Sequence, residues 1–217
     1  MNIKRLRILG SNYIGLFSIA NDNLCFVPRN IDSDSTKIIE ETLLVKVVKT
    51  SIYESSLLAV FAKMNNKYAY LPSFASPKEI EEVEKEIQVR IIDTEHALGN
   101  LIEVNDEFGV LSTLLREKEV AQISKGGLKI MQTNIGQINT VGSALLIANK
   151  GFAINPNASR EEVKRIQDLL HVRGGAATAN TGDGFIRNCV IANSKGMVVG
   201  EATTGHEINR IEEALEE

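Results

Sequence analysis

Residues 144–156 read ALLIANKGFAINP, and forty-four residues further on residues 188–200 read NCVIANSKGMVVG. Each stretch runs from an apolar segment through Ala-Asn into a Lys-Gly turn and then into a second apolar segment. Two apolar runs joined by a short turn that contains glycine are typical of a β-hairpin. The chain therefore contains the same hairpin at least twice, which indicates an internal repeat.

The asparagine before the turn recurs five times and defines the period. We call these residues the marker asparagines, and we interpret them as structural turn residues. Each is preceded and followed by an apolar-rich segment. The five residues are Asn21, Asn65, Asn105, Asn149 and Asn193, and the spacings between them are 44, 40, 44 and 44 residues.

A helix and a third strand are expected after each hairpin. Capping boxes at 76–79, 159–162 and 204–207 are followed by apolar residues at helical spacing, and weaker helices are predicted at roughly 34–43 and 116–124. Third strands are predicted at 44–49, 87–92, 128–133 and 170–175.

The fifth repeat reaches residue 217 without a third strand, whereas residues 3–9 are predicted to form a strand that no repeat includes. We expect this N-terminal strand to complete the fifth repeat, which would close a ring and remove exposed sheet edges. The predicted fold class is α+β, with five strand-strand-helix-strand repeats in a closed ring of pseudo-fivefold symmetry, an α/β propeller. We expect a single domain over 1–217, with the first strands around the axis and repeats at approximately 10–53, 54–96, 97–140, 141–184 and 185–217.

The composition is that of an ordinary globular protein, with 43% hydrophobic and 24% charged residues. The formal net charge of -4 lacks the basic surplus of proteins that bind phosphate backbones, so DNA is not expected as a partner and RNA is not expected as the main one. No apolar run approaches the roughly 20 residues of a membrane span, so no membrane partner is expected. Two cysteines are too few for a disulfide framework, and we expect a cytoplasmic protein.

Several stretches, in this order and at one phase of the repeat, resemble the translation initiation factor 6 family of ribosome anti-association factors. They are ALGN at 97–100, VGSALLIANKG at 141–151, INPNAS at 154–159, TANTGDG at 178–184 and GEATTGHEINRIEEAL at 200–215. The resemblance covers essentially the whole chain and implies the pentein fold. The sequence ends with its last predicted helix, as an archaeal-type member of the family would.

The resemblance also implies a function. Members bind the large ribosomal subunit on the face that meets the small subunit, where they contact a ribosomal protein near the sarcin-ricin loop of the rRNA. A bound factor keeps the two subunits apart sterically. We therefore expect a factor that is not an enzyme, that has no cofactor or metal ion, and that is a monomer.

The binding face is expected at the end of the axis where the chain enters the five first strands. By resemblance, Asn100 of ALGN is the strongest candidate contact, followed by Ala144 and Phe185. Tyr13 is a candidate because aromatic anchors are common at the centres of interfaces. Asparagine and glycine here also fit plain turn geometry, and Phe185 also fits a core position. The other candidates on this face are Asn12, Ser56, Gly99, Ser143 and Asn188.

The alternative function is that of a guanidine-modifying pentein hydrolase or transferase with a cysteine nucleophile. Cys25 and Cys189 are expected inside the apolar strands LCFV and CVIA, which indicates small buried side chains rather than reactive thiols. The three histidines, His96, His171 and His206, do not form a zinc-binding pattern. No catalytic residue is therefore assigned.

Overall fold

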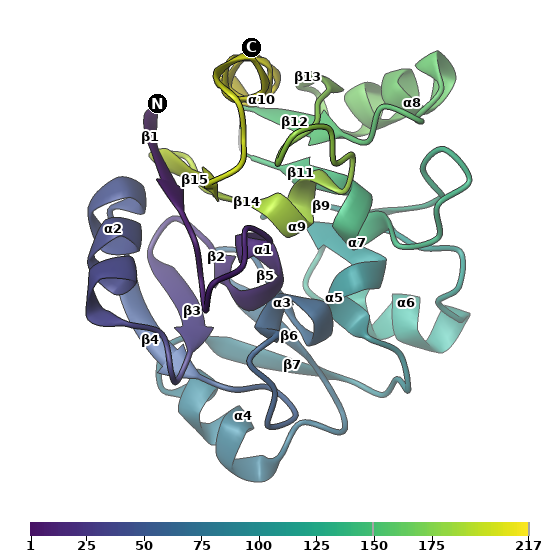
Figure 1. Cartoon of the computed structure of the whole chain (residues 1–217). Helices are drawn as coiled ribbons and strands as arrows, with labels where there is room; N and C mark the ends of the chain where they lie inside the picture. Colours follow the sequence, from purple (N-terminus) through teal and green to yellow (C-terminus); the bar gives the residue numbers. More distant parts are fainter. Residues whose placement is uncertain (149, 217) are drawn as a thin grey trace.

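The computed structural model describes residues 1–148 and 150–216 of the chain. Over these residues, five three-stranded sheets are arranged in a ring, each with a long helix at the outside (Figure 1). This mixed α+β ring of five repeated units confirms the predicted pentein-like fold.

The hairpin strands pair antiparallel within each unit. The first strands surround the axis: β2 (Ile19–Ala20), β5 (Lys63–Met64), β8 (Ile102–Val104), β11 (Leu145–Ile147) and β14 (Val190–Ala192). Their antiparallel partners are β3 (Leu24–Pro28), β6 (Tyr68–Pro72), β9 (Phe108–Leu111), β12 (Gly151–Ile154) and β15 (Gly196–Gly200).

The third strand of each sheet pairs parallel with the second strand. These edge strands are β4 (Lys46–Thr50), β7 (Gln88–Ile92), β10 (Lys129–Gln132), β13 (Arg173–Ala176) and β1 (Asn2–Leu6). The long outer helices supply the crossover that parallel pairing requires. They are α2 (Ser33–Leu43), α4 (Pro77–Glu84), α6 (Glu117–Ser124), α8 (Arg160–Leu170) and α10 (Gly205–Glu216).

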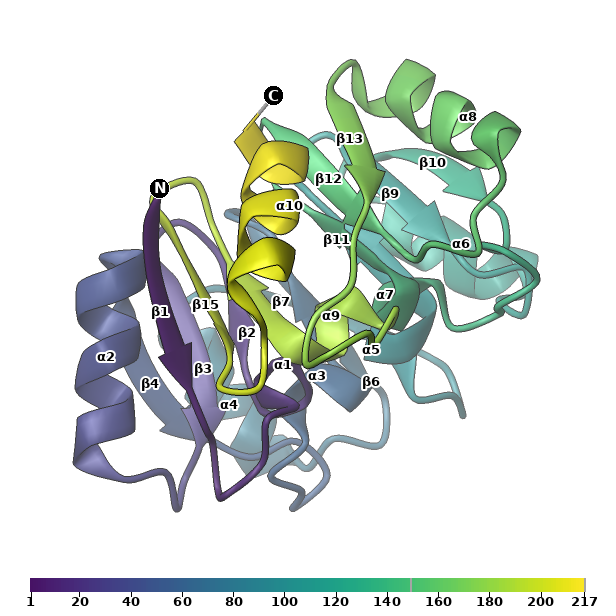
Figure 2. The same cartoon turned by 45° about the horizontal axis from the view of Figure 1, so that its top comes forward.

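The N-terminal strand closes the ring as predicted. β1 lies beside β15 in parallel, with Asn2 opposite Gly196 and Leu6 opposite Gly200 (Figures 1 and 2). The amino group of Met1 also donates a hydrogen bond to Glu212 on α10 at 3.2 Å. The two ends of the sequence therefore build one sheet.

The marker asparagines have the structural role that was predicted for them. The side-chain oxygen of Asn21 accepts the backbone N–H groups of Asn23 and Leu24 at 2.8 and 2.7 Å, which holds the turn. Its Nδ2 donates to the backbone oxygen of Asn65 in the next hairpin at 2.9 Å. The same pattern recurs at Asn65, and Asn193 donates to Asn21 O at 3.0 Å. Asn149, the fourth marker, lies outside the described residues.

The apolar cores lie between neighbouring units rather than inside each unit. Phe26 of β3 and Leu71 of β6 share one core with Val83 of α4, and Val27 of β3 and Val198 of β15 share another with Ile39 of α2. Each long helix covers the junction between its own sheet and the preceding one. Because no unit has a core of its own, we propose that the chain forms one domain.

Several local predictions were wrong. The segments that enter the first strands are one-turn helices instead of loops: α1 (Ile14–Phe17), α3 (Leu58–Phe61), α5 (Leu98–Leu101), α7 (Val141–Ala144) and α9 (Ile186–Cys189). Cys189 therefore ends a helix and does not lie in a strand. The third strand of the fourth unit begins only at Arg173, because His171 caps α8 in the left-handed conformation, with φ at 55°.

No helix among the described residues combines the length and the apolarity that crossing a membrane would require.

Joining the two termini tests the ring closure. A circular permutant that links residue 217 to Met1 through a short Gly-Ser linker and opens between Leu9 and Gly10 makes β1 the third strand after α10. We expect its Tm to lie within about 4 °C of that of the parent chain, because the sheet is unchanged. Deletion of residues 1–8 removes Leu6 and Ile8 from a core in which they are 7% and 0% exposed, and should lower Tm by about 10 °C or more. Thermal melts by circular dichroism measure both, and a permutant that melts like the deletion would contradict the closure.

Candidate functional site

The five one-turn helices form one end of the axis in the described part of the chain, which we call the short-helix end. Each packs against its neighbours around the axis: α1 against α3 and α9, and α5 against α3 and α7 (Figure 1). The hairpin turns with the marker asparagines form the opposite end. A partner that binds along the axis therefore meets either a ring of helix starts or a ring of turns.

Small residues at the second helical position allow this close packing. A Cβ atom on Gly15 would lie 1.9 Å from Arg187 O, one on Gly99 would lie 2.0 Å from Ala59 O, and one on Gly142 would lie 2.2 Å from Gly99 O. These distances are far below any allowed contact with a backbone atom. The helices pack backbone against backbone, and only glycine fits at these three positions.

Three of the predicted contact residues lie inside the protein. Gly99 is buried in the helix packing, Ser143 is 4% exposed, and Ala144 is fully buried. The side chain of Ala144 therefore does not reach a partner at this surface, because it packs in the core between the third and fourth units. Ser143 instead positions Asn100, since its hydroxyl donates to Asn100 Oδ1 at 3.2 Å.

The other predicted contact residues lie at or near the surface. Tyr13 and Phe185 are 42% and 38% exposed, so Phe185 is not a core residue. Asn12, Ser56, Asn100 and Asn188 are half-buried. Whether any of them contacts a partner stays a prediction.

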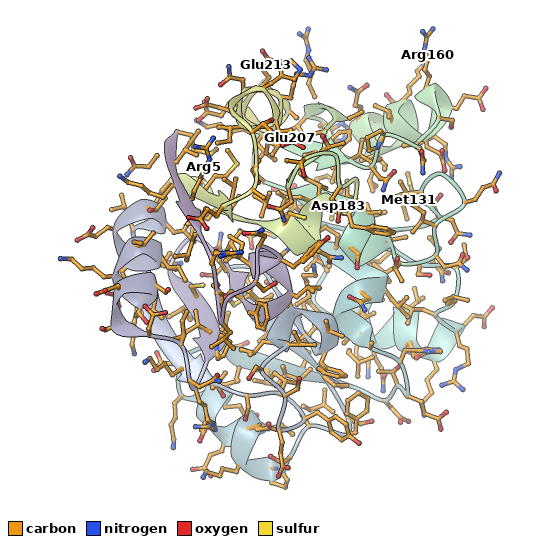
Figure 3. All side chains as sticks on the ribbon, in the orientation of Figure 1. Arg5, Met131, Arg160, Asp183, Glu207 and Glu213 are labelled. Carbon is orange, nitrogen blue, oxygen red and sulfur yellow. The ribbon has the colours of Figure 1, made fainter. Side chains whose placement is uncertain are left out.

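Tyr13 and Phe185 flank one carboxylate. Tyr13 immediately precedes α1 and Phe185 immediately precedes α9, which are adjacent in the ring. The backbone N–H of Phe185 donates to Asp183 Oδ1 at 2.7 Å, and Figure 3 labels Asp183 beside α9. A hydrogen bond to Asp183 and the charge of that carboxylate raise the pKa of Tyr13. The ring junction between the first and fifth units thus presents two exposed aromatic rings around an acidic group.

Capping-box glutamates hold the turns that lead into the short helices. Glu207 closes the box of α10 with Thr204, and it also accepts the backbone N–H groups of Thr181 and Gly182 at 3.2 and 2.8 Å (Figure 3). Thr181 and Gly182 have φ of 66° and 109°, a left-handed turn that needs such support. Glu79 accepts in the same way from Tyr53 and Glu54. The capping boxes were predicted, but this second role was not.

The hydrogen bonds keep these carboxylates ionised. Burial raises the pKa of Glu207, but the hydrogen bonds from Thr204, Gly182 and Thr178 outweigh it, so the pKa lies below its ordinary value. The pKa of Glu79 is lowered for the same reason.

A second aromatic group lies near the start of the second unit. The rings of Tyr53, Phe61 and Phe74 contact one another edge to face, with centroids 5.1 to 6.0 Å apart. Tyr53 is 59% exposed and left-handed, with φ at 56°. The sequence has no local pattern for this group, because its members come from three separate segments.

Three charged side chains are buried inside the ring, and we call them the axial charge cluster: Lys63, Glu103 and Arg187. They are 3%, 3% and 5% exposed. Lys63 Nζ lies 2.6 Å from Glu103 Oε2, and Arg187 Nε lies 3.9 Å from the same oxygen. Two cations therefore share one carboxylate. Burial, together with the charge of Arg187, lowers the pKa of Lys63 to about 8, although Glu103 opposes the shift.

The cluster has a signal in the sequence. Lys63 and Glu103 stand inside otherwise apolar first strands. Arg187 takes the second position of its one-turn helix, which is alanine in the second unit and glycine in the three remaining units. Charged residues are almost never fully buried unless they are paired, so their place in the repeat indicated a buried pair.

The cysteines do not support the enzyme alternative. Cys25 and Cys189 are both fully buried, and burial raises the pKa of each thiol to about 12. The thiolate is the nucleophile, so a cysteine of this kind is inert at neutral pH. Over the described residues, no group of three or more His, Cys, Asp or Glu side chains is placed to hold a metal ion.

Comparison with known proteins gives a consistent result. The model of the eIF-6 family matches residues 3–214. A protein of Pyrococcus horikoshii named translation initiation factor 6 is 35% identical over 224 residues, covering 99% of each chain. Proteins of the same name from Saccharolobus islandicus and Thermoplasma acidophilum are 32% and 30% identical, and the matches cover 98% or more of every chain.

Replacing Gly99 by alanine separates a packing role from a contact role. The added Cβ would lie 2.0 Å from Ala59 O, so we expect a loss of about 2 kcal/mol or more in the free energy of unfolding. The matched control is Gly205→Ala at the start of α10, where a Cβ meets nothing within 4 Å and stability should hold or rise slightly. Urea unfolding measures both. Equal stabilities of the two variants would contradict the packing role.

Glu207→Gln should remove a pH-dependent contribution to stability. The pKa of Glu207 in the folded state is below its unfolded value, so its contribution is present above the unfolded value of about 4.3 and is lost as the pH falls through the folded value. We expect Glu207→Gln to lose about 2 kcal/mol at pH 7 and to approach the parent chain near pH 3. The control is Glu213→Gln on the exposed face of α10, where the loss should stay below about 0.5 kcal/mol. A pH-independent difference between parent and Glu207→Gln would be the contrary result.

Proposed function

The chain belongs to the eIF-6 family of translation initiation factors, and we propose that it binds the large ribosomal subunit and sterically prevents association with the small subunit. Relatives named translation initiation factor 6 match the full length of the chain, and this observation carries the proposal. The proposal includes a monomeric, cytoplasmic factor without catalytic activity, whose partners are neither DNA nor a membrane.

The mechanism we propose needs excluded volume and no chemistry. A compact domain of 217 residues has a radius of gyration of roughly 17 Å. A body about 40 Å across, held in the joint between two subunits, prevents their closure. The factor then has only to remain bound, and a slow dissociation rate is enough for that.

The short-helix end is the face that fits this role best. A specific interface takes about 800 Å² from each partner, which is less than a tenth of the 9394 Å² of accessible surface. Tyr13 and Phe185 supply exposed aromatic area there, and aromatic residues dominate the centres of interfaces. Asn100 adds an amide that Ser143 holds in place.

The buried candidates change role in this proposal. Gly99, Ser143 and Ala144 shape the face from within, while Asn12, Tyr13, Ser56, Asn100, Phe185 and Asn188 present groups to a partner. The formal charge of -4 favours a ribosomal protein of the intersubunit face as the main contact, with the sarcin-ricin loop of the rRNA nearby.

Co-sedimentation with purified large subunits tests both the function and the face. The parent chain should pellet with large subunits and should reduce the yield of joined ribosomes when small subunits are added. Tyr13→Ala, Phe185→Ala and Asn100→Ala should each raise Kd by about tenfold, with unchanged Tm. Asn23→Ala, at an exposed position of the hairpin end, is the matched control and should bind like the parent chain.

Two contrary results have different meanings. A parent chain that stays in the supernatant would refute the proposed function. A parent chain that pellets while all three variants bind equally well would leave the function standing and refute the short-helix end as the binding face.

A further inference from the structure

The axial charge cluster contacts all five units of the ring. Its three members come from the second, third and fifth units: Lys63, Glu103 and Arg187. Lys63 Nζ also donates a hydrogen bond to Gly142 O in the fourth unit at 3.3 Å. Arg187 Nη1 donates to Gly15 O in the first unit, also at 3.3 Å. The cluster and its bonds therefore form one buried network that joins every unit at the axis.

The carbonyl groups that receive these bonds belong to the one-turn helices. Gly142 and Gly15 are the second residues of α7 and α1. Ser18 is the C-cap of α1, and its backbone oxygen accepts from Arg187 Nη2 at a longer 3.5 Å. A helix leaves its last four carbonyl groups without a partner in the helix, so a four-residue helix depends on outside donors. A buried cation meets this need with charge-assisted hydrogen bonds, which are stronger than bonds between neutral groups.

Arg187 links the two helices that carry the exposed aromatic rings. It is the second residue of α9, which Phe185 precedes, and it bonds α1, which Tyr13 precedes. The two helices are neighbours in the ring (Figures 1 and 2). Nη1 also donates to Val190 O at the end of α9 at 3.2 Å, so one planar guanidinium fixes both helices. The spacing and orientation of Tyr13 and Phe185 therefore depend on Arg187.

Lys63 and Glu103 fix the surroundings of Asn100. Lys63 holds the carbonyl group of Gly142 in α7. The next residue of this helix, Ser143, donates its hydroxyl hydrogen to Asn100 Oδ1 at 3.2 Å. Glu103 Oε1 accepts a backbone N–H of β11 at 3.2 Å, which ties the strand that follows Asn100 to the fourth unit. The third candidate contact is thus held by the same network as the two aromatic rings.

We propose that the axial charge cluster positions the short-helix end for binding to the large ribosomal subunit. The cluster is buried and touches no partner itself, and it acts through the helices that hold Tyr13, Phe185 and Asn100. A buried ion pair seldom stabilises a fold more than apolar side chains of the same volume would. Hydrogen bonds to particular carbonyl groups impose a direction that apolar packing does not. This role rests on the proposed function and adds to it the residues that keep the face in shape.

Arg187→Ala tests the network in the free protein. The change leaves Lys63 and Glu103 as a neutral pair, and alanine occupies this helical position in the second unit, so we expect the chain to stay folded at 25 °C. Without the guanidinium, α1 and α9 open more readily. Backbone amides of residues 15–18 and 187–190 should exchange hydrogen at least about tenfold faster, whereas those of α6 should keep the parent rate. Hydrogen exchange followed by mass spectrometry measures both.

Lys63→Met tests the other part of the network in the same way. It leaves Glu103 with Arg187 as a neutral pair and removes the donor to α7. Amides of residues 141–145 should exchange about tenfold faster, and those of residues 15–18 should keep the parent rate. If Arg187→Ala is unfolded at 25 °C, this variant decides.

Binding to purified large subunits connects the cluster to the face. Arg187→Ala should raise Kd by about fivefold to tenfold at 25 °C. In a chain that already carries Tyr13→Ala and Phe185→Ala, the same change should raise Kd less than about twofold, because the side chains through which it acts are gone. A residue that only supports the fold would weaken both chains by the same factor. The matched control is Arg210→Ala, an exposed arginine on α10, which should change neither Kd nor exchange.

Three results would overturn the proposal. One is an exchange rate at α1 and α9 that Arg187→Ala leaves unchanged. Another is faster exchange over the whole chain, α6 included, which would give the cluster a general stabilising role only. The third is a rise in Kd of equal size with and without the aromatic rings of Tyr13 and Phe185. A parent chain that does not pellet with large subunits would instead refute the proposed function, and the exchange rates would still decide whether the cluster fixes the helices.

Discussion

Burial between neighbouring units is the constraint on which the rest of the structure depends. Each sheet covers its apolar side chains against the next sheet and a long helix, so a single unit would expose most of what it buries in the ring. Closure through β1 and β15 supplies the last of these junctions. We therefore expect the ring to unfold as one cooperative unit. At the axis the constraint is tighter still, because Gly15, Gly99 and Gly142 let neighbouring backbones touch.

The features with a long period could be predicted from the sequence. The marker asparagines recur because each holds its own turn and donates a hydrogen bond to the next hairpin. The spacing of these asparagines in the sequence therefore equals the length of the structural repeat. The capping boxes of α4, α8 and α10 are local in the chain, and the bonds that close them join residues three apart. The N-terminal strand was predicted from a gap in the count of strands, which needs no knowledge of contacts.

The rest could not be predicted because it depends on contacts between units. A one-turn helix is too short to show a helical period, so α5 and α7 were taken for loops, and Ala144 was taken for a surface residue although it is fully buried. The second role of Glu207, which holds the turn at Thr181, joins residues 26 apart and leaves no local pattern. Lys63, Glu103 and Arg187 lie in three different units, and only the closed ring brings them together.

The two ends of the axis differ in what they leave for a partner. At the hairpin end, the side-chain amides of the marker asparagines Asn21, Asn65 and Asn193 donate hydrogen bonds to neighbouring turns. Asp22 and Asp106 both accept a hydrogen bond from Asn66. At the short-helix end, Tyr13 and Phe185 remain exposed. The backbone there is ordered by hydrogen bonds to Glu207 and by the close packing of the one-turn helices. A surface that is already ordered loses little conformational entropy when it binds. The end that combines free aromatic area with a fixed backbone is therefore the one where we propose that a partner binds.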